Sequence, residues 1–231
     1  MAYAERTDDC DKPQNLFFFI DATNSNTFEN FCPLIIVLQM VVAAFSPSPS
    51  SGIQIGSLLF SDNAKHREPS PVFETDSSCL NAVQGEDHSL RSLMEEFGIC
   101  LDKHRKYDST KFLSMCGEGT SAVWGLEKIR DIVRTKSARE STVLMITDGI
   151  IEDGTEERTT CLSELESAGV TIIEAGYGDA DLSTMKLYTD PDNIMIDDDP
   201  VELGKAIVNK LKVKGILCDK YGNSSYKINI L

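Results

Sequence analysis

Five oxygen-bearing side chains, carried by three separate stretches of this chain, have the types and spacing of a site for one divalent cation. They are Asp21, Thr23, Ser25, Thr120 and Asp148. Asp21 directly follows an apolar run at 16–20, and Asp148 follows Thr147 and a second apolar run at 143–146. Unbroken apolar runs are typical of buried parallel strands, and ligand sites in open α/β sheets lie at the carboxyl ends of such strands. The sequence therefore predicts that both carboxylates stand on one edge of a sheet.

The mixture of ligands indicates what such a site would do. Asp21, Thr23 and Ser25 alternate along the chain, so a loop turning around an ion can direct all three side chains toward it. Thr120 and Asp148 would arrive from neighbouring connections. Oxygen ligands suit Mg²⁺ and Mn²⁺, and three neutral hydroxyls with only two carboxylates leave such an ion electrophilic. We therefore expect Mg²⁺ or Mn²⁺ here, with an Asp or Glu of a partner protein as a further ligand, rather than hydrolytic chemistry.

Strand and helix patterns alternate along the chain, which predicts an α/β fold. Expected strands cover residues 16–20, 53–60, 71–75, 143–147, 170–175 and 193–196. Expected helices cover residues 28–45, 90–101, 120–135, 156–168, 181–188 and 200–213. The prediction is a doubly wound, mostly parallel central sheet with helices on both faces and one short antiparallel edge strand at 71–75, where flanking prolines disfavour a central position. Asp198 or Asp199 would cap the last helix, and Trp124 would lie in the core.

These motifs and their order resemble a von Willebrand factor A domain. Asp-x-Thr-x-Ser after the first strand, Gly-Thr at a helix start and Thr-Asp-Gly after a later strand are similar to that family's metal-ion-dependent adhesion site. Thr23 replaces a serine of the family pattern but keeps a hydroxyl. The resemblance covers residues 10–218, which we interpret as one domain, with terminal extensions at 1–9 and 219–231.

The resemblance implies a function as well as a fold. As in integrin inserted domains and parasite surface adhesins, a carboxylate of a protein ligand would complete the coordination of the metal. The chain would then be a cell-surface or matrix adhesion module within a larger protein. The resemblance also implies that the last helix, at 200–213, slides to couple the metal site to distant tension.

Charge and hydropathy exclude several kinds of partner. The chain has 37 acidic and 22 basic residues and a net charge of −15, which argues against nucleic acid and anionic membranes. The most apolar segment, at 31–45, contains Pro33 and is too short to span a bilayer. We therefore expect no direct membrane insertion in this segment of chain.

Cysteine usage favours an extracellular or cell-surface location. Seven cysteines are present without a zinc-like cluster, and a bridge between Cys10 and Cys218 would clasp the ends of the domain. Such a bridge resembles the end-to-end disulfide of several extracellular members of the family. The sequon at Asn223 would accept a glycan in a secreted protein. Residues 1–11 are polar and do not resemble a signal peptide, so the chain is expected to be part of a longer precursor.

Other functions fit the residues less well. A haloacid-dehalogenase-type phosphatase needs a second carboxylate where Thr23 stands. The glycine-rich stretch at 117–122 mimics a dinucleotide fingerprint but follows a poor strand. The aspartates at 197–199 are better explained as a helix cap than as a calcium site. We find no nucleophile or acid–base pair and expect no enzyme. The alternative that stays open is an intracellular scaffold domain of the same fold, with or without metal, that mediates assembly of a multiprotein complex. Seven reactive thiols after unfolding would favour it.

Overall fold

The computed structural model describes residues 14–21, 53–60, 121–136, 140–147 and 151–217, together with residues 37, 38, 40, 41 and 44 of a further helical segment. In this part of the chain the strands are β1 (Gln14–Asp21), β2 (Ile53–Phe60), β3 (Glu140–Thr147), β4 (Val170–Gly176) and β5 (Ile194–Ile196). The helices are α5 (Val123–Lys136), α6 (Thr155–Ser167), α7 (Leu182–Met185), the short 3-10 helix η2 (Pro191–Asn193) and α8 (Pro200–Val213).

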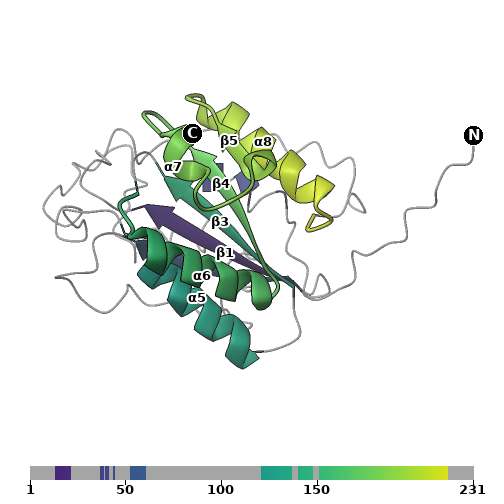
Figure 1. The fold of residues 1–231 in the computed structure, drawn as a ribbon. Coiled ribbons are helices and arrows are strands. Elements are labelled where there is room, and N and C mark those ends of the chain that lie inside the picture. Colours follow the sequence, from purple (N-terminus) through teal and green to yellow (C-terminus); the bar gives the residue numbers. More distant parts are fainter. Residues whose placement is uncertain are drawn as a thin grey trace, which may run out of the picture.

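The strands form one five-stranded sheet in the order β2-β1-β3-β4-β5. All four neighbouring pairs are parallel, and β1 lies between β2 and β3. Figure 1 shows α5 and α6 on one side of the sheet and α8 on the other. The predicted α/β architecture with a parallel sheet covered on both faces is confirmed. The predicted antiparallel edge strand at 71–75 and the helix at 90–101 lie outside the described residues.

Local sequence patterns account for most element boundaries. β2 and α8 begin and end where the sequence predicts, and β1 and β3 extend their apolar runs by a few polar residues. Asp199 caps α8 by accepting the backbone N–H of Val201 over 2.8 Å. α6 ends before Gly169, whose positive φ of 75° lets the chain turn directly into β4.

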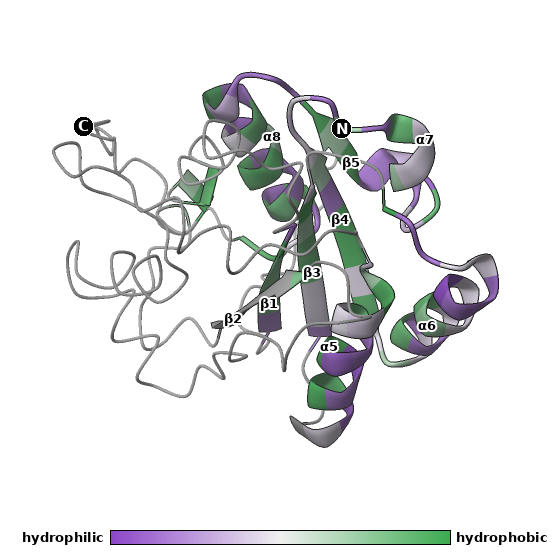
Figure 2. Cartoon of the chain, turned by 90° about the vertical axis from the view of Figure 1, so that its left-hand side faces the viewer, coloured by the Kyte–Doolittle hydropathy of each residue, from purple (hydrophilic) through white to green (hydrophobic). Residues whose placement is uncertain are grey.

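Each face of the sheet packs against its helices. On the α5 and α6 face, Phe19, Met145 and Ile172 join a continuous apolar cluster with Leu126 and Leu165 of the two helices. α5 and α8 each carry both apolar and polar residues along their length, as expected of helices with one buried face (Figure 2). No helix among the described residues is long and apolar enough to cross a membrane.

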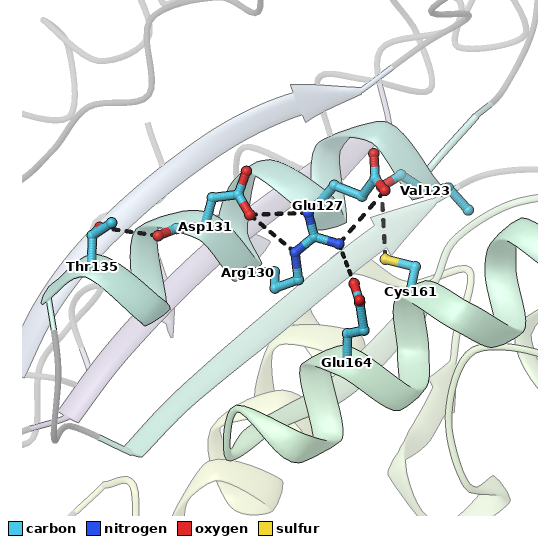
Figure 3. A network of polar contacts seen from close by, with 7 residues as sticks. All are labelled: Val123, Glu127, Arg130, Asp131, Thr135, Cys161 and Glu164. Carbon is cyan, nitrogen blue, oxygen red and sulfur yellow. Dashed lines mark hydrogen bonds and ion pairs between the residues drawn. The ribbon is translucent and has the colours of Figure 1, made fainter.

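Polar contacts join α5 and α6 at the edge of this layer (Figure 3). The guanidinium of Arg130 on α5 forms an ion pair with Glu164 on α6 and also contacts Glu127 and Asp131 of its own helix. Cys161, which is buried and free, donates from Sγ to the backbone carbonyl of Val123 over 3.8 Å. The two helices are therefore held together by both apolar and polar contacts.

The helical pattern predicts that Trp124 lies in the core, but the structure places it elsewhere. It is only half-buried, and the ammonium of Lys128 lies 5.3 Å from its ring centroid. This part of the prediction is wrong because Leu126 and Ile129 are the α5 residues that lie fully inward, so Trp124 lies on the flank of the buried stripe.

Candidate metal centre at the carboxyl edge of the sheet

Asp21 stands where the sequence predicts, as the last residue of β1. Its side chain is completely buried, and Oδ2 accepts a hydrogen bond of 2.7 Å from Thr147 Oγ1 at the end of β3. Because a buried carboxylate needs polar partners, this hydroxyl is part of what makes the position tolerable. The two side chains are 126 residues apart in sequence and meet because β1 and β3 are neighbours.

The carboxyl ends of three strands meet at this edge. Ile20 pairs with Ile146 in the β1–β3 register, and Thr147 pairs with Gly176 in the β3–β4 register. The N–H of Tyr177, just after β4, donates to the carbonyl of Thr147 over 3.1 Å. The backbone that leads directly into Asp148 is therefore fixed on both sides.

The start of α5 is held against the same region by Asp153. Its Oδ1 accepts from Ser121 Oγ over 2.6 Å, and its Oδ2 accepts from the N–H groups of Ala122 and Val123 over 2.9 and 3.0 Å. A negative charge on the first amides of a helix also interacts favourably with the helix dipole. Thr120 immediately precedes this capped turn. The helix begins at Val123 rather than at the predicted residue 120, with Asp153 serving as its cap from a distant loop.

Two further side chains surround Asp153. The phenol of Tyr188 donates to Asp153 Oδ2 over 2.5 Å, and Arg158 Nη1 donates to the Asp153 carbonyl over 3.3 Å. The Arg158 guanidinium also lies over the Tyr188 ring, 5.6 Å from its centroid. Burial of the ring, together with the hydrogen bond to Asp153, raises the pKa of the Tyr188 phenol well above its usual value. Tyr188 therefore remains a neutral donor.

Of the five predicted ligands, the structure describes only Asp21. Thr23, Ser25, Thr120 and Asp148 lie outside the described residues, as do Cys10, Cys218 and the sequon at Asn223. The structure does place the residue after Thr120 and the residue before Asp148. Thr147 contacts Asp21 at the carboxyl edge of the sheet, and Ser121 is held by Asp153.

Thr147 and Asp153 are the residues that sequence reasoning missed. In the sequence Thr147 stands out only as part of the Thr-Asp-Gly motif, although its position at the end of β3 brings it into contact with Asp21. Asp153 gives no local signal, because the helix it caps begins 30 residues earlier in the chain.

The side chains at this edge carry ligand atoms that suit a hard cation. Asp21 and Thr147 offer oxygen only, which is the ligand type that Mg²⁺ and Mn²⁺ prefer. Among the described residues there is no cluster of three or more His, Cys, Asp or Glu that could hold a metal. Four of the five predicted ligands lie outside the residues that this finding covers, so the ligand set stays a prediction.

A second buried carboxyl lies two residues before the end of β4. Glu174 has no exposed surface, and neither of its carboxyl oxygens has a hydrogen-bond partner. Burial raises the pKa of Glu174 to about 9. The group is therefore protonated at neutral pH and contributes no negative charge to the sheet edge.

No known family profile and no curated protein matches this sequence. Solved structures do match its fold. Proximal thread matrix protein 1 from the mussel byssus, in a structure with a zinc-occupied MIDAS motif, has a TM-score of 0.56 and 15% identity, over 91% of this chain and 49% of that one. A von Willebrand factor type A protein from Catenulispora acidiphila has a TM-score of 0.56 and 13% identity, over 89% and 43%.

A third similar structure is the TFIIH p34 N-terminal domain, with a TM-score of 0.57 and 10% identity, over 86% of this chain and 98% of that one. The chain spans about half the length of the mussel protein. Together with the strand order and the helices on both faces, these similarities show that the chain has the fold of a von Willebrand factor A domain.

Proposed function

We propose that the chain is an adhesion module that binds an acidic protein ligand through Mg²⁺ or Mn²⁺ at the carboxyl edge of its sheet. The observation that supports this most strongly is the meeting of Asp21 and Thr147 at the ends of β1 and β3. Asp21, Thr23, Ser25, Thr120 and Asp148 would hold the ion, directly or through water. Once bound, the ion would supply a positive centre that accepts a carboxylate oxygen of the ligand.

The protein's own residues would prepare this edge. Thr147 holds the Asp21 carboxylate through a hydrogen bond, and Asp153 fixes the turn that follows Thr120. Both arrangements keep ligands in place before an ion arrives, which reduces the ordering cost of binding. The fold neighbour with a zinc-occupied MIDAS motif supports the binding of a divalent ion by a protein of this fold.

Calorimetric titration with MgCl₂ and MnCl₂ tests the metal site. We expect saturable binding to the wild type and its loss in Asp21→Asn, which removes the charge at nearly constant volume. Glu140→Gln is the matched control, because Glu140 is exposed at the opposite end of β3 and its replacement removes the same charge. Binding that survives in Asp21→Asn, or is lost equally in Glu140→Gln, would contradict the site.

The ligand class needs a separate test. An array of peptides in matched pairs, with Glu or Asp in one member and Gln or Asn in the other, is probed with and without Mg²⁺. Capture by the acidic members only, and only with the ion, is the expected result. We propose no catalytic activity, since the described residues around Asp21 and Asp153 provide hydrogen-bonding and capping partners rather than an activated nucleophile.

Similarity to the TFIIH p34 N-terminal domain over nearly its whole length supports one alternative, an intracellular scaffold domain. Titration of thiols after unfolding without reductant separates the two settings. Seven reactive thiols would favour the intracellular scaffold. Fewer than seven would favour an extracellular module with disulfide bonds, of which the predicted Cys10–Cys218 bridge would be one.

A further inference from the structure

One carboxylate oxygen joins two segments that are far apart in sequence. Asp153 Oδ2 accepts the phenol of Tyr188 over 2.5 Å and the backbone N–H groups of Ala122 and Val123 over 2.9 and 3.0 Å. Tyr188 closes the helical segment that begins with α7, through a hydrogen bond from its N–H to the carbonyl of Met185. A side chain of the α7 segment and the first turn of α5 therefore share a single acceptor.

Tyr188 is held firmly at its end of this contact. Tyr188 is 4% exposed and belongs to the apolar cluster on the α5 and α6 face of the sheet. Arg158 covers the ring and also binds the carbonyl of Asp153. Any movement of the α7 segment that withdraws the phenol must therefore disturb Asp153.

The start of α5 depends on Asp153 in turn. α5 has no acidic residue in its first turn, and within the described part of the chain Asp153 is the only side chain that accepts from the N–H groups of Ala122 and Val123. Ala122 is completely buried, so water cannot readily replace a lost partner. Charge-assisted hydrogen bonds of this kind are among the stronger ones in proteins.

We infer that the hydrogen bond between Tyr188 and Asp153 couples the α7 segment to the start of α5, so that displacement of Tyr188 loosens the turn that follows Thr120. Asp153 is thus a residue that positions the first turn of α5, and the hydrogen bond from Tyr188 holds Asp153 in place. The inference rests on the proposed function in one respect, because Thr120 is a predicted ligand and the coupling would therefore regulate metal affinity.

Amide hydrogen exchange on the metal-free chain tests the coupling without any ligand. Tyr188→Phe removes the hydroxyl and keeps the ring. Thr189→Val is the matched control, because it removes a neighbouring hydroxyl, which donates to the carbonyl of Ile172 over 2.7 Å, without touching Asp153. We expect the amides of Ala122 and Val123 to exchange at least about tenfold faster in Tyr188→Phe and at the wild-type rate in Thr189→Val.

Unchanged exchange in Tyr188→Phe, or equal acceleration in both variants, would overturn the coupling. Protection of the central β1 amides in both variants confirms that the fold is kept. The metal arm then uses the same proteins with MgCl₂, and weaker binding by Tyr188→Phe alone is expected. Unchanged affinity despite faster exchange would overturn the regulatory role. Absence of Mg²⁺ binding by the wild type would instead contradict the proposed function, and the exchange result alone would still decide the coupling.

Discussion

Thr147 Oγ1 lies 2.7 Å from Asp21 Oδ2, and this contact ties the last residue of β3 to the last residue of β1. Both side chains are completely buried. The contact therefore has two consequences, one for the stability of the sheet and one for the geometry of the candidate metal site.

Replacement of Thr147 tests whether its hydroxyl, rather than the packing of its side chain, stabilises the sheet and the candidate metal site. Thr147→Val keeps the shape but removes the donor, and we expect it to lower the free energy of unfolding by about 1–3 kcal/mol, since a buried carboxylate loses a partner. Thr147→Ser keeps the hydroxyl and should cost less. Urea unfolding measures both, and Mg²⁺ titration should rank them in the same order. Equal stability of the two variants would show that the hydroxyl is unimportant.

Glu174 predicts an unusual dependence of stability on pH. Burial raises the pKa of Glu174 to about 9 in the folded chain, from an ordinary value of 4.5 for a free side chain. Between these values the folded state keeps a proton that the unfolded state releases. The free energy of unfolding therefore falls as pH rises from about 4.5 to about 9. The loss levels off above about pH 9.

Glu174→Gln isolates this contribution, because it cannot ionise and has nearly the same volume. We expect urea unfolding of this variant between pH 5 and pH 8 to show a smaller decline in stability than the wild type. Glu140→Gln, at an exposed position, should follow the wild-type curve. Parallel curves for wild type and Glu174→Gln would mean that Glu174 is ionised in the folded protein.

Gly204 marks the close approach of α8 to the helical segment that contains Met40. A Cβ added at Gly204 would lie 2.7 Å from Met40 Sδ and 3.2 Å from Met40 Cβ. Alanine favours helices by up to about 1 kcal/mol over glycine, yet we expect Gly204→Ala to destabilise the protein by about 1–3 kcal/mol through overpacking. Thermal unfolding checks this, and Met40→Ala in the same chain should restore part of the loss.

The same contact bears on the sliding of α8 that the family resemblance implies. If Gly204→Ala is as stable as the wild type, the packing between α8 and Met40 is loose enough to yield.

Cys161 is predicted to be unreactive in the folded protein. Its side chain is 2% exposed, and burial raises the pKa of its thiol to about 12, so the nucleophilic thiolate is scarce at pH 8. Alkylation at pH 8 followed by peptide mass spectrometry should leave Cys161 unmodified in buffer and label it fully in denaturant. Rapid labelling in buffer would indicate that α6 opens locally.

Features set by neighbouring residues could be predicted from the sequence. The apolar runs fixed β1 and β3, and Asp199 was one of two expected caps of α8 because a cap bonds to amides within three residues. The end of the apolar run at 16–20 likewise predicts that β1 stops near Asp21, which is its last residue.

Features set by contacts across the fold could not be predicted. The cap of α5 comes from Asp153, which follows the helix by a whole strand, so no local pattern announces it. Glu174 interrupts an apolar run that reads as a buried strand, and its lack of partners follows only from the packing around β4. The half-exposure of Trp124 likewise depends on which face of α5 the sheet covers.

The position of β1 in the middle of the sheet also constrains how the protein is made. β1 is synthesised first among the described strands, but its neighbour β3 leaves the ribosome more than a hundred residues later. Until then the phenylalanine-rich strand has only β2 to pair with, and pairings so distant in sequence form slowly. Its apolar surface is exposed to aggregation during that interval. Nascent chains that end before residue 147 should therefore bind chaperones, and release should follow the synthesis of β3.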